Sequence, residues 1–385
     1  MAETYRISRF QVKGFRRLSD VDLQMRPFTT VIGVNGSGKT SLLDAFSLLS
    51  ESAAGKLPST LVRLGGLSDI LTRGKSDALE LSVEVEVPAD GFGTYGFRLV
   101  PMNNRYLIEA EGLRQWGGRR KSSFQHIAAG LPDDKVHYID PEKGHLVSVD
   151  WDYNHAETAL SQVPKTLRKP EEFRRILSTA VKYNAPAVGG NAPLLLPQQM
   201  WPATGPGANG EDLLPFLYNL RETDGDRYGA VVDTMKAAFP DFVELGFPPV
   251  AAGKMSMTWK DEKFSRPLYH HELSEGTLRF LWLVSLLQSP ALPAVTMIDE
   301  PDASLHPELM RLLTGLMREA SARTQIIAVT HSDRLVRFVE PEELLVFDLD
   351  EDGNTTANYA DTFDIEEWLS DYRLDELWSM GNLKG

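Results

Sequence analysis

Apolar and polar residues along the first third of the chain follow patterns that predict β-strands. Runs rich in β-branched and aromatic residues, several with a two-residue period, cover residues 5–12, 28–33, 79–87, 94–100 and 105–111. After the second of these runs, residues 39–49 have the apolar spacing of an amphipathic helix. We therefore expect the N-terminal third to be rich in sheet.

The pattern changes after residue 112. Helices are predicted over residues 165–182, 211–222 and 226–239, whereas residues 186–210, rich in proline, glycine and asparagine, predict an extended loop. From residue 273 onward helical and strand patterns alternate, which predicts a mainly parallel sheet. Residues 363–385 predict one short amphipathic helix and a tail.

Composition narrows the class of protein. The 385 residues exceed one average domain, so we expect two domains or one domain with a large insertion. An apolar share of 42% is ordinary for a soluble protein with a sizeable core. The absence of cysteine excludes disulfides, cysteine–zinc sites and thiol catalysis. A net charge of −14 argues against a wholly basic surface, but it permits a local basic patch.

The sequence contains no sign of secretion or membrane insertion. The N-terminal residues MAETYRISRFQ lack the apolar core of a signal peptide. The longest apolar stretch, residues 280–287, is far shorter than the roughly 20 residues that a membrane helix needs. We therefore expect a cytoplasmic protein with no membrane contact.

The stretch GVNGSGKTS, residues 33–41, matches the phosphate-binding pattern G-x-x-x-x-G-K-[ST] and lies between a predicted strand and a predicted helix. Glycines let successive N–H groups turn toward phosphate oxygens, and the helix dipole adds positive potential. Lys39 is expected to reach the β- and γ-phosphates, and the Thr40 hydroxyl to bind Mg²⁺. The alternative is a glycine-rich turn without a ligand. The predicted nucleotide-binding residues are Gly33, Asn35, Gly36, Ser37, Gly38, Lys39, Thr40 and Ser41.

Two carboxylates, Asp299 and Glu300, directly follow the apolar strand pattern of residues 294–298. Open α/β sheets bind ligands at the carboxyl ends of their strands, so these side chains are expected beside the phosphate-binding loop. Asp299 would bind Mg²⁺ through water, and Glu300 would polarise the water that attacks the γ-phosphate. Taken alone, the pair could equally be a turn that ends a core strand, but the phosphate-binding loop favours catalysis.

Two further stretches carry candidate residues. A second strand pattern ends at His331, whose imidazole can donate a hydrogen bond to the γ-phosphate. The stretch LSEGT, residues 273–277, begins an almost wholly apolar helix, where Ser274 and the N–H groups freed by Gly276 would form an anion site. One nucleotide cannot easily use both this site and the P-loop of the same molecule. We therefore expect an ATP-dependent, head-to-tail homodimer; the alternative is a capped core helix.

The ordered set GVNGSGKTS, LSEGT, MIDEPDASLHP and VTHS resembles the heads of ABC-type ATPases. In this resemblance LSEGT stands for their LSGGQ signature, residues 303–305 for their D-loop and His331 for their switch histidine. The opening residues 7–49 look like the RecF/SMC-like group. With ELSEGTLRFLWLVSLL and the C-terminal EEWLSDYRLDELWSMGNLKG, they resemble its small stand-alone bacterial predicted AAA ATPases.

The resemblance implies an α/β fold, namely a P-loop NTPase head of ABC type with an antiparallel β subdomain and a mainly helical insertion. We assign the N-terminal lobe to residues 1–112, the insertion to 113–262, the C-terminal lobe to 263–362, and the last helix and tail to 363–385. The role of the glutamine with which ABC heads bind Mg²⁺ and water is not assigned to any residue, because no glutamine occurs between Gln24 and Gln115. Phe15 and Arg16 are candidates for contact with adenine, and ordinary hairpin packing is the alternative.

The function implied is a switch that binds and hydrolyses ATP with Mg²⁺, and that serves DNA repair or antiphage defence. Because few residues follow His331, a nuclease effector would be a separate partner. The alternatives are the energy-coupling subunit of a membrane transporter and a regulatory ATPase that acts on a protein without DNA. DNA contact is possible at two basic stretches, residues 113–121 and 164–182, although solvated helix and loop faces explain them as well.

Overall fold

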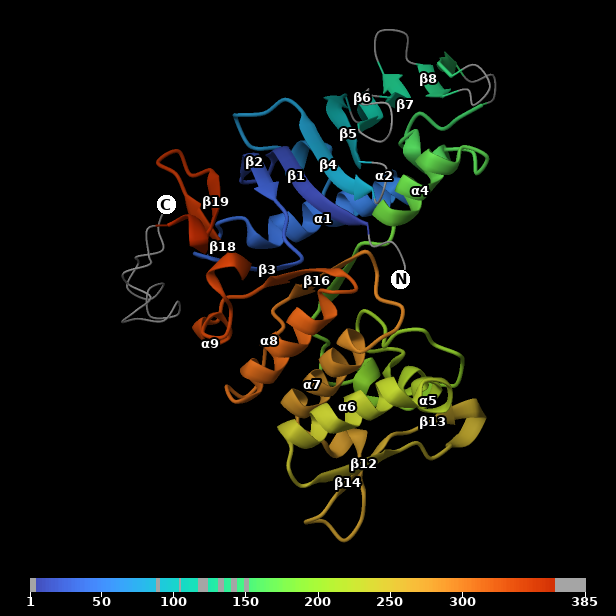
Figure 1. The fold of residues 1–385 in the computed structure, drawn as a ribbon, viewed down its shortest axis with the longest axis vertical. Helices are drawn as coiled ribbons and strands as arrows, with labels where there is room; N and C mark the ends of the chain where they lie inside the picture. Colours follow the sequence, from blue (N-terminus) through green and yellow to red (C-terminus); the bar gives the residue numbers. More distant parts are fainter. Residues whose placement is uncertain are drawn as a thin grey trace. The chain divides into compact units, whose positions relative to one another are not determined.

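The computed structural model describes residues 5–87, 91–103, 105–116, 124–130, 135–139, 144–148 and 152–363. The chain divides into two compact units, each of which is described by itself (Figure 1). Unit 1 contains the described residues up to Val181 together with Leu345–Phe363. Unit 2 contains Lys182–Leu344.

Unit 1 is built on an eight-stranded antiparallel sheet in the order β2-β1-β4-β5-β6-β7-β8-β9. Its strands are β1 (Arg6–Phe15), β2 (Leu18–Gln24), β4 (Leu79–Val87), β5 (Gly91–Met102), β6 (Arg105–Trp116), β7 (Phe124–Gly130), β8 (Lys135–Ile139) and β9 (Leu146–Ser148). Side chains alternate between the two faces of a strand. On β4, Leu81 and Val83 are buried, whereas Glu80 and Ser82 lie on the outer face.

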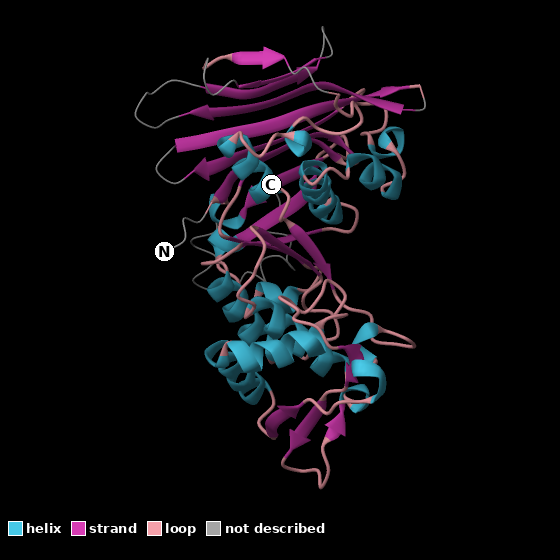
Figure 2. Cartoon of the chain, turned by 90° about the vertical axis from the view of Figure 1, so that its right-hand side faces the viewer, coloured by secondary structure: helices cyan, strands magenta, loops and turns pink. Residues whose placement is uncertain are grey.

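Helices cover the inner face of this sheet (Figure 2). They include α1 (Lys39–Ala53), α2 (Leu57–Arg63) and α4 (Arg168–Leu177), and the short α3 (Leu67–Ile70) and η1 (Leu160–Gln162) also belong to unit 1. The rings of Phe10 on β1 and Phe46 on α1 stack at 3.8 Å, so this helix is fixed to the sheet by apolar contact. Its position fixes the loop that precedes it.

Three further strands of unit 1 follow the order β3-β18-β19, and they are β3 (Phe28–Gly33), β18 (Leu344–Leu349) and β19 (Thr355–Tyr359). All six residues of β3 are buried. β18 and β19 form an antiparallel hairpin. They come from the C-terminal part of the chain, so the lobe assigned to residues 263–362 does not form one unit. The cause is long-range strand pairing, which a local pattern does not encode.

Unit 2 combines three strands with a group of helices. β10 (Val181–Asn184), β16 (Val295–Asp299) and β17 (Gln325–Val329) lie in that order, and β16 pairs with β17 in parallel. The helices are α5 (Leu213–Thr223), α6 (Gly225–Ala238), α7 (Glu275–Leu287), α8 (Leu309–Ala320) and α9 (Asp333–Val336). Trp282 of α7 is fully buried, and its indole N–H donates to the carbonyl of Gly207 at 3.0 Å. The apolar α7 is therefore a core helix.

Unit 2 also contains small antiparallel pieces. β12 (Phe242–Gly246), β14 (Thr258–Asp261) and β15 (Leu268–Tyr269) form one sheet, and β11 (Gln198–Gln199) pairs with β13 (Lys254–Met255). The remaining short turns are η2 (Pro193–Leu195), η3 (Ala251–Gly253), η4 (His270–Glu272), η5 (Pro341–Glu343) and, in unit 1, η6 (Ala360–Thr362). The proline- and glycine-rich residues 186–210 are mainly loop, as expected.

Two boundaries differ from the sequence analysis. The antiparallel sheet continues past residue 112, because Gly112 pairs with Gly96 inside the β5–β6 ladder instead of ending the strand. The helix expected over residues 165–182 ends at Leu177, and Val181 already begins β10. The terminal helix expected over residues 363–385 lies outside the described residues except for Phe363. The α/β class and the antiparallel subdomain are confirmed.

Candidate functional site

The phosphate-binding loop of unit 1 is shaped by positions that only glycine tolerates. Gly33 ends β3 at φ +151°, where a Cβ would lie 2.1 Å from the carbonyl oxygen of Phe347. Gly38 has φ +100°, and a Cβ there would lie 2.7 Å from the Thr355 hydroxyl. Gly36 has φ +78° with open space around it, so its backbone conformation is the only constraint.

Lys39 lies inside this loop. Its side chain is buried, and its ammonium donates to the carbonyl oxygens of Gly33 at 2.7 Å and Val34 at 2.9 Å. Thr40 is exposed, whereas Ser37 is buried and its hydroxyl has no hydrogen-bond partner among the residues that the structure describes. The loop thus holds its cation in place through neutral oxygens, and a phosphate would offer that cation a stronger, charged acceptor.

The helix that follows the loop begins without a side-chain cap. Gly38 is the N-cap residue of α1, and the first turn contains no acidic side chain. The first N–H groups of a helix have no partner within the helix and carry the positive end of its dipole. A loop that ends in this way is suited to binding phosphate.

The predicted acidic residues lie at the end of β16 in unit 2. Asp299 is partly buried and forms an ion pair with Lys182 of β10 at 3.2 Å, a neighbour that the sequence analysis missed. Glu300 is exposed and has φ +52°, a conformation that costs a non-glycine residue about 1 kcal/mol or more. Its N–H donates to the carbonyl of Val329 on β17 at 2.8 Å. Glu300 therefore lies just past the end of β16, with its side chain exposed.

His331 follows β17 and is exposed. The preceding residue, Thr330, is fully buried, and its hydroxyl donates to the Asp302 carboxylate at 2.5 Å and accepts from the N–H of Ser332 at 2.9 Å. The segment after Glu300 and the segment that bears His331 are therefore linked by hydrogen bonds inside unit 2.

The start of α7 contacts the same segment. The Ser274 hydroxyl is the N-cap and accepts from the N–H of Thr277 at 3.1 Å. A Cβ on Gly276 would lie 2.6 Å from the carbonyl oxygen of Ser304. The Ser304 hydroxyl donates to Glu275 at 2.7 Å. The contact with Ser304 therefore explains why residue 276 is a glycine. Ser274 caps the helix, and its contact with nucleotide stays a prediction.

The structure places the predicted residues in two groups. The loop residues from Gly33 to Ser41 belong to unit 1, whereas Ser274, Gly276, Asp299, Glu300 and His331 belong to unit 2. Among the described residues, no cluster of three or more histidine, aspartate or glutamate side chains could hold a metal ion by itself. The Mg²⁺ donors that the sequence predicts, the Thr40 hydroxyl and the Asp299 carboxylate, therefore lie in different units. Both are oxygen donors of the kind that Mg²⁺ takes beside substrate phosphates, and their joint role stays a prediction.

The first hairpin gives no support for a role in base stacking. Phe15 is fully buried, so it packs in the core. Arg16 forms an ion pair with Asp44 of α1 at 2.7 Å. Hairpin packing accounts for both residues.

Comparison with known proteins shows a family to which the chain is similar. The family model described as "AAA domain, putative AbiEii toxin, Type IV TA system" matches residues 28–337. The OLD nuclease of Thermus scotoductus is 34% identical over 376 residues, which cover 92% of this chain and 64% of that protein. The DNA replication and repair protein RecF of Aliivibrio fischeri (strain MJ11) is 26% identical over 190 residues, which cover 46% and 47%. The chain thus spans about half to two thirds of the length of these relatives.

Solved structures with a similar fold include heads of SMC proteins. An SMC head bound to the C-terminal winged-helix domain of ScpA has a TM-score of 0.59 at 12% identity, and the match covers 95% of this chain and 99% of that one. An SMC head with an extended coiled coil from Pyrococcus furiosus has a TM-score of 0.55 at 12% identity, with 96% and 99% covered. The expected resemblance to RecF/SMC-like ABC-type ATPases is confirmed. No described helix is long and apolar enough to span a membrane.

Proposed function

The chain belongs to this AAA-domain family, and on that basis we propose that it is a switch that binds and hydrolyses ATP. The phosphate-binding loop is the observation that carries the proposal. Three glycines in conformations that other residues avoid precede a buried lysine, and the helix that follows them begins without a side-chain cap. A turn that only connected β3 to α1 would need neither the buried cation nor the open helix start.

In this proposal each site residue has one task. Lys39 exchanges its carbonyl partners for β- and γ-phosphate oxygens, and Thr40 and Asp299 are the protein donors for Mg²⁺, which would neutralise phosphate charge. Glu300 accepts a proton from the attacking water, and its exposed position just past the end of β16 suits that task. His331 donates a hydrogen bond to the γ-phosphate. Lys182 forms an ion pair with Asp299, so it would offset part of the negative charge of this carboxylate.

The experiment that tests this function separates binding from chemistry. Lys39→Ala should weaken ATP binding by at least tenfold, because a charge-assisted contact to phosphate is lost. Glu300→Gln should bind ATP as the wild type does and hydrolyse it at least a hundredfold more slowly, since only water activation is removed. Calorimetry with MgATP and a phosphate-release assay measure the two effects. Wild-type hydrolysis by Glu300→Gln would disprove the assignment of Glu300.

We further propose that the active form is a head-to-tail dimer, in which Ser274 and Gly276 of one copy close over the ATP held by the other. Ser274 is exposed at the N-terminus of α7, where the helix dipole favours an anion. The contact of Gly276 with Ser304 would transmit the position of α7 to the segment that carries Glu300. The phosphate held by one copy would thus affect Glu300 of the other copy, which hydrolyses that copy's own ATP.

We also propose that this switch serves DNA repair or antiphage defence and acts together with a separate effector, such as a nuclease. The names of the relatives, OLD nuclease and RecF, support this proposal. The basic stretch at residues 164–182 supports DNA contact less than expected. Lys169 pairs with Glu172 at 3.3 Å, and Arg174 pairs with Glu171 at 2.6 Å. Of the other stretch, residues 117–121 lie outside the described residues.

A different region of unit 1 is better suited to DNA. A cavity of about 440 Å³ is lined by Arg16, Arg17, Asp69, Leu71, Thr72, Arg73, Lys75, Asp352, Gly353 and Asn354. Arg17 and Lys75 donate to neutral backbone or amide oxygens of residues 352–354. Within the described part of the chain Arg73 forms no ion pair. Arg17 and Arg73 can therefore bind phosphate without first losing a carboxylate partner.

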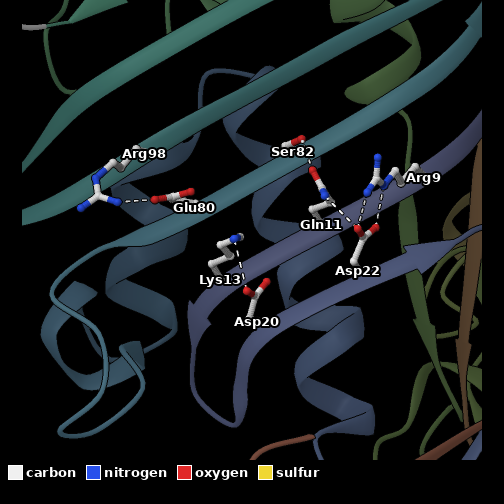
Figure 3. Close-up of polar contacts among 8 residues, drawn as sticks. All are labelled: Arg9, Gln11, Lys13, Asp20, Asp22, Glu80, Ser82 and Arg98. Carbon is white, nitrogen blue, oxygen red and sulfur yellow. Dashed lines mark hydrogen bonds and ion pairs between the residues drawn. The ribbon is translucent and has the colours of Figure 1, made fainter. Parts of the chain in front are cut away.

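The outer face of the antiparallel sheet offers the contrast (Figure 3). Three of its cations are neutralised: Arg9 pairs with Asp22, Lys13 with Asp20, and Arg98 with Glu80 and Glu109. The hydrogen bond from Arg9 lowers the pKa of Asp22, which keeps that carboxylate charged. Cations that already pair with carboxylates gain little free energy when they bind phosphate.

The two regions make a matched test of DNA contact. Arg73→Ala should weaken binding of a DNA oligonucleotide about fivefold or more in low salt and should reduce the salt slope by about 1, because one phosphate contact is lost. Lys13→Ala on the sheet should have no effect. Fluorescence anisotropy in the presence of ATP measures both variants. If Arg73→Ala weakens ATP binding instead, the cavity belongs to the nucleotide; if the wild type binds no DNA, the partner is a protein.

A further inference from the structure

The P-loop of unit 1 is held from outside by a residue 318 positions further along the chain. The Thr355 hydroxyl, buried at the start of β19, donates a hydrogen bond of 2.6 Å to the carbonyl oxygen of Ser37. The same hydroxyl lies 2.7 Å from the point where a Cβ on Gly38 would be. The Gly38 position therefore does not tolerate a side chain while Thr355 lies against it.

This bond fixes the direction of a peptide group in the loop. The peptide between Ser37 and Gly38 is planar, and in a trans peptide the C=O and N–H bonds point in opposite directions. Because the carbonyl of Ser37 is directed at Thr355, the N–H of Gly38 is directed away from β19. That N–H is among those that a P-loop presents to phosphate oxygens.

Thr355 is itself fixed by its neighbours. Its N–H donates to the carbonyl of Arg17 at 3.1 Å, in the β1–β2 hairpin. The turn before it, residues 350–354, is held by Lys75, whose ammonium donates to the Asp352 carbonyl at 3.0 Å and to the Asn354 side chain at 2.8 Å. The Arg17 guanidinium donates to the carbonyl of Gly353 at 3.1 Å. The hydroxyl therefore acts from a turn that is held at several points.

We propose that Thr355 is a positioning residue of the nucleotide site: its hydroxyl orients the Ser37–Gly38 peptide so that the Gly38 N–H is ready for phosphate before the nucleotide arrives. This inference rests on the proposed ATP binding, and it adds a residue outside the P-loop motif. The motif residues supply the N–H groups, and Thr355 supplies the orientation. Without it the peptide can rotate, and binding must then restrict a loop that has more than one conformation.

The test compares three substitutions of buried threonine residues in the full chain. Thr355→Val keeps the shape and removes the hydrogen bond, and it should raise the Kd for MgATP about tenfold. Thr355→Ser restores the hydroxyl and should bind within about twofold of the wild type. The control is Thr29→Val, which removes the buried hydrogen bond of 3.0 Å between Thr29 and Tyr359 on the same β19. It should lower the melting temperature as Thr355→Val does and leave the Kd unchanged.

Each outcome decides the proposal. Equal Kd values for Thr355→Val and wild type overturn it, as does an equal loss of affinity in Thr29→Val, which would reveal a general loss of stability. A serine variant as weak as valine would also overturn it, because serine retains the hydroxyl and the loss of affinity would then follow any change at this position. If Thr355→Val does not fold, the exposed Lys75→Ala, which loosens the turn, must raise the Kd about twofold to threefold, and an unchanged Kd overturns the proposal. A wild type that binds no MgATP refutes the proposed function itself.

Discussion

Two helices of this chain begin at sequences rich in glycine and hydroxyl residues, and they present their first N–H groups in opposite ways. The start of α1, at Gly38, has no side-chain cap. The start of α7 is capped by Ser274, which accepts from the N–H of Thr277. Close contact with the carbonyl of Ser304 also restricts Gly276. The first helix start is open to a ligand, whereas the second is partly satisfied by its own chain.

A third group of N–H donors is satisfied by a carboxyl group from a distant part of the chain. The N–H groups of Ala159 and Leu160, at the start of η1, donate to the carboxylate of Glu111 at 2.6 and 2.8 Å. Glu111 comes from β6 and is buried. In all three cases backbone N–H groups are the donors, but their acceptors differ. No side chain caps the start of α1, a local hydroxyl caps α7, and a carboxyl group from a distant strand accepts at η1. The same residue types therefore serve binding in one place and stability in another.

The largest expected effect concerns the activity of mixed dimers. If α7 completes a neighbour's site, Ser274→Arg should leave ATP binding intact, since the P-loop is untouched, and should abolish hydrolysis. A mixture with the inactive Lys39→Ala chain should regain part of the activity, because the mixed dimer contains one intact composite site. Phosphate release by each variant alone and by the mixture tests this. Near-normal hydrolysis by Ser274→Arg alone would show that α7 is a capped core helix with no part in a neighbour's site.

The second effect is on the stability of unit 2. Gly276→Ala should destabilise it by about 1–3 kcal/mol, because the new methyl group would lie 2.6 Å from the Ser304 carbonyl. The control is Gly315→Ala, the same change at an exposed position of α8 with nothing within 4 Å, which should stabilise by about 0.5–1 kcal/mol. Urea denaturation of both variants gives the comparison. Equal stabilities would show that the contact with Ser304 is not tight.

The third effect is a pH dependence of unit 1. Burial raises the pKa of Glu111 from an ordinary 4.5 to about 7, despite the hydrogen bonds it accepts. The folded state thus binds the proton more tightly than the unfolded chain. The stabilising contribution is complete below pH 4.5 and is lost as the pH rises through about 7, and it amounts to about 3 kcal/mol at most. Urea midpoints measured from pH 5 to 8 should fall for the wild type.

The control for this pH dependence is Glu111→Gln, which has no proton to lose. Its amide can accept one of the two N–H donors, so it should be less stable than the wild type at pH 5 but should show a flatter profile. A wild type and a glutamine variant with the same slope would place the titrating group elsewhere.

How far the sequence predicts this protein depends on the range of the interaction. The bounds of β3 and β4 and the glycines of the P-loop were predictable, because strand alternation and backbone conformation are local properties. Thr355 was not, because its contact with Ser37 joins residues 318 positions apart. Lys182 was assigned to the end of a helix, and only the pairing of β10 with β16 shows it beside Asp299.

The same limit applies to the signature stretch LSEGT. Its sequence indicated both an anion site and a cap, and the local hydrogen bond of Ser274 establishes the cap without excluding the anion. The role of Gly276 needed the position of Ser304, which the chain reaches only after β16. Residues 350–354 carried no recognised motif, although they hold the P-loop in place through Thr355.

The smallest expected effect separates the two roles of Ser274 directly. Ser274→Ala removes the cap of α7 and should cost about 1 kcal/mol. Ser37→Ala, at the open helix start, should cost close to nothing, because the hydroxyl it removes is buried without a partner among the described residues.

Ser274→Asp is the decisive variant. Aspartate caps a helix as well as serine does, so stability should be retained, but its charge would repel a phosphate approaching from a second copy. Stability measured by denaturation should therefore be close to wild type while ATP hydrolysis falls at least tenfold. If Ser274→Asp hydrolyses ATP normally, the start of α7 serves only as a helix cap. The starts of α1 and α7 would then differ in function as well as in structure.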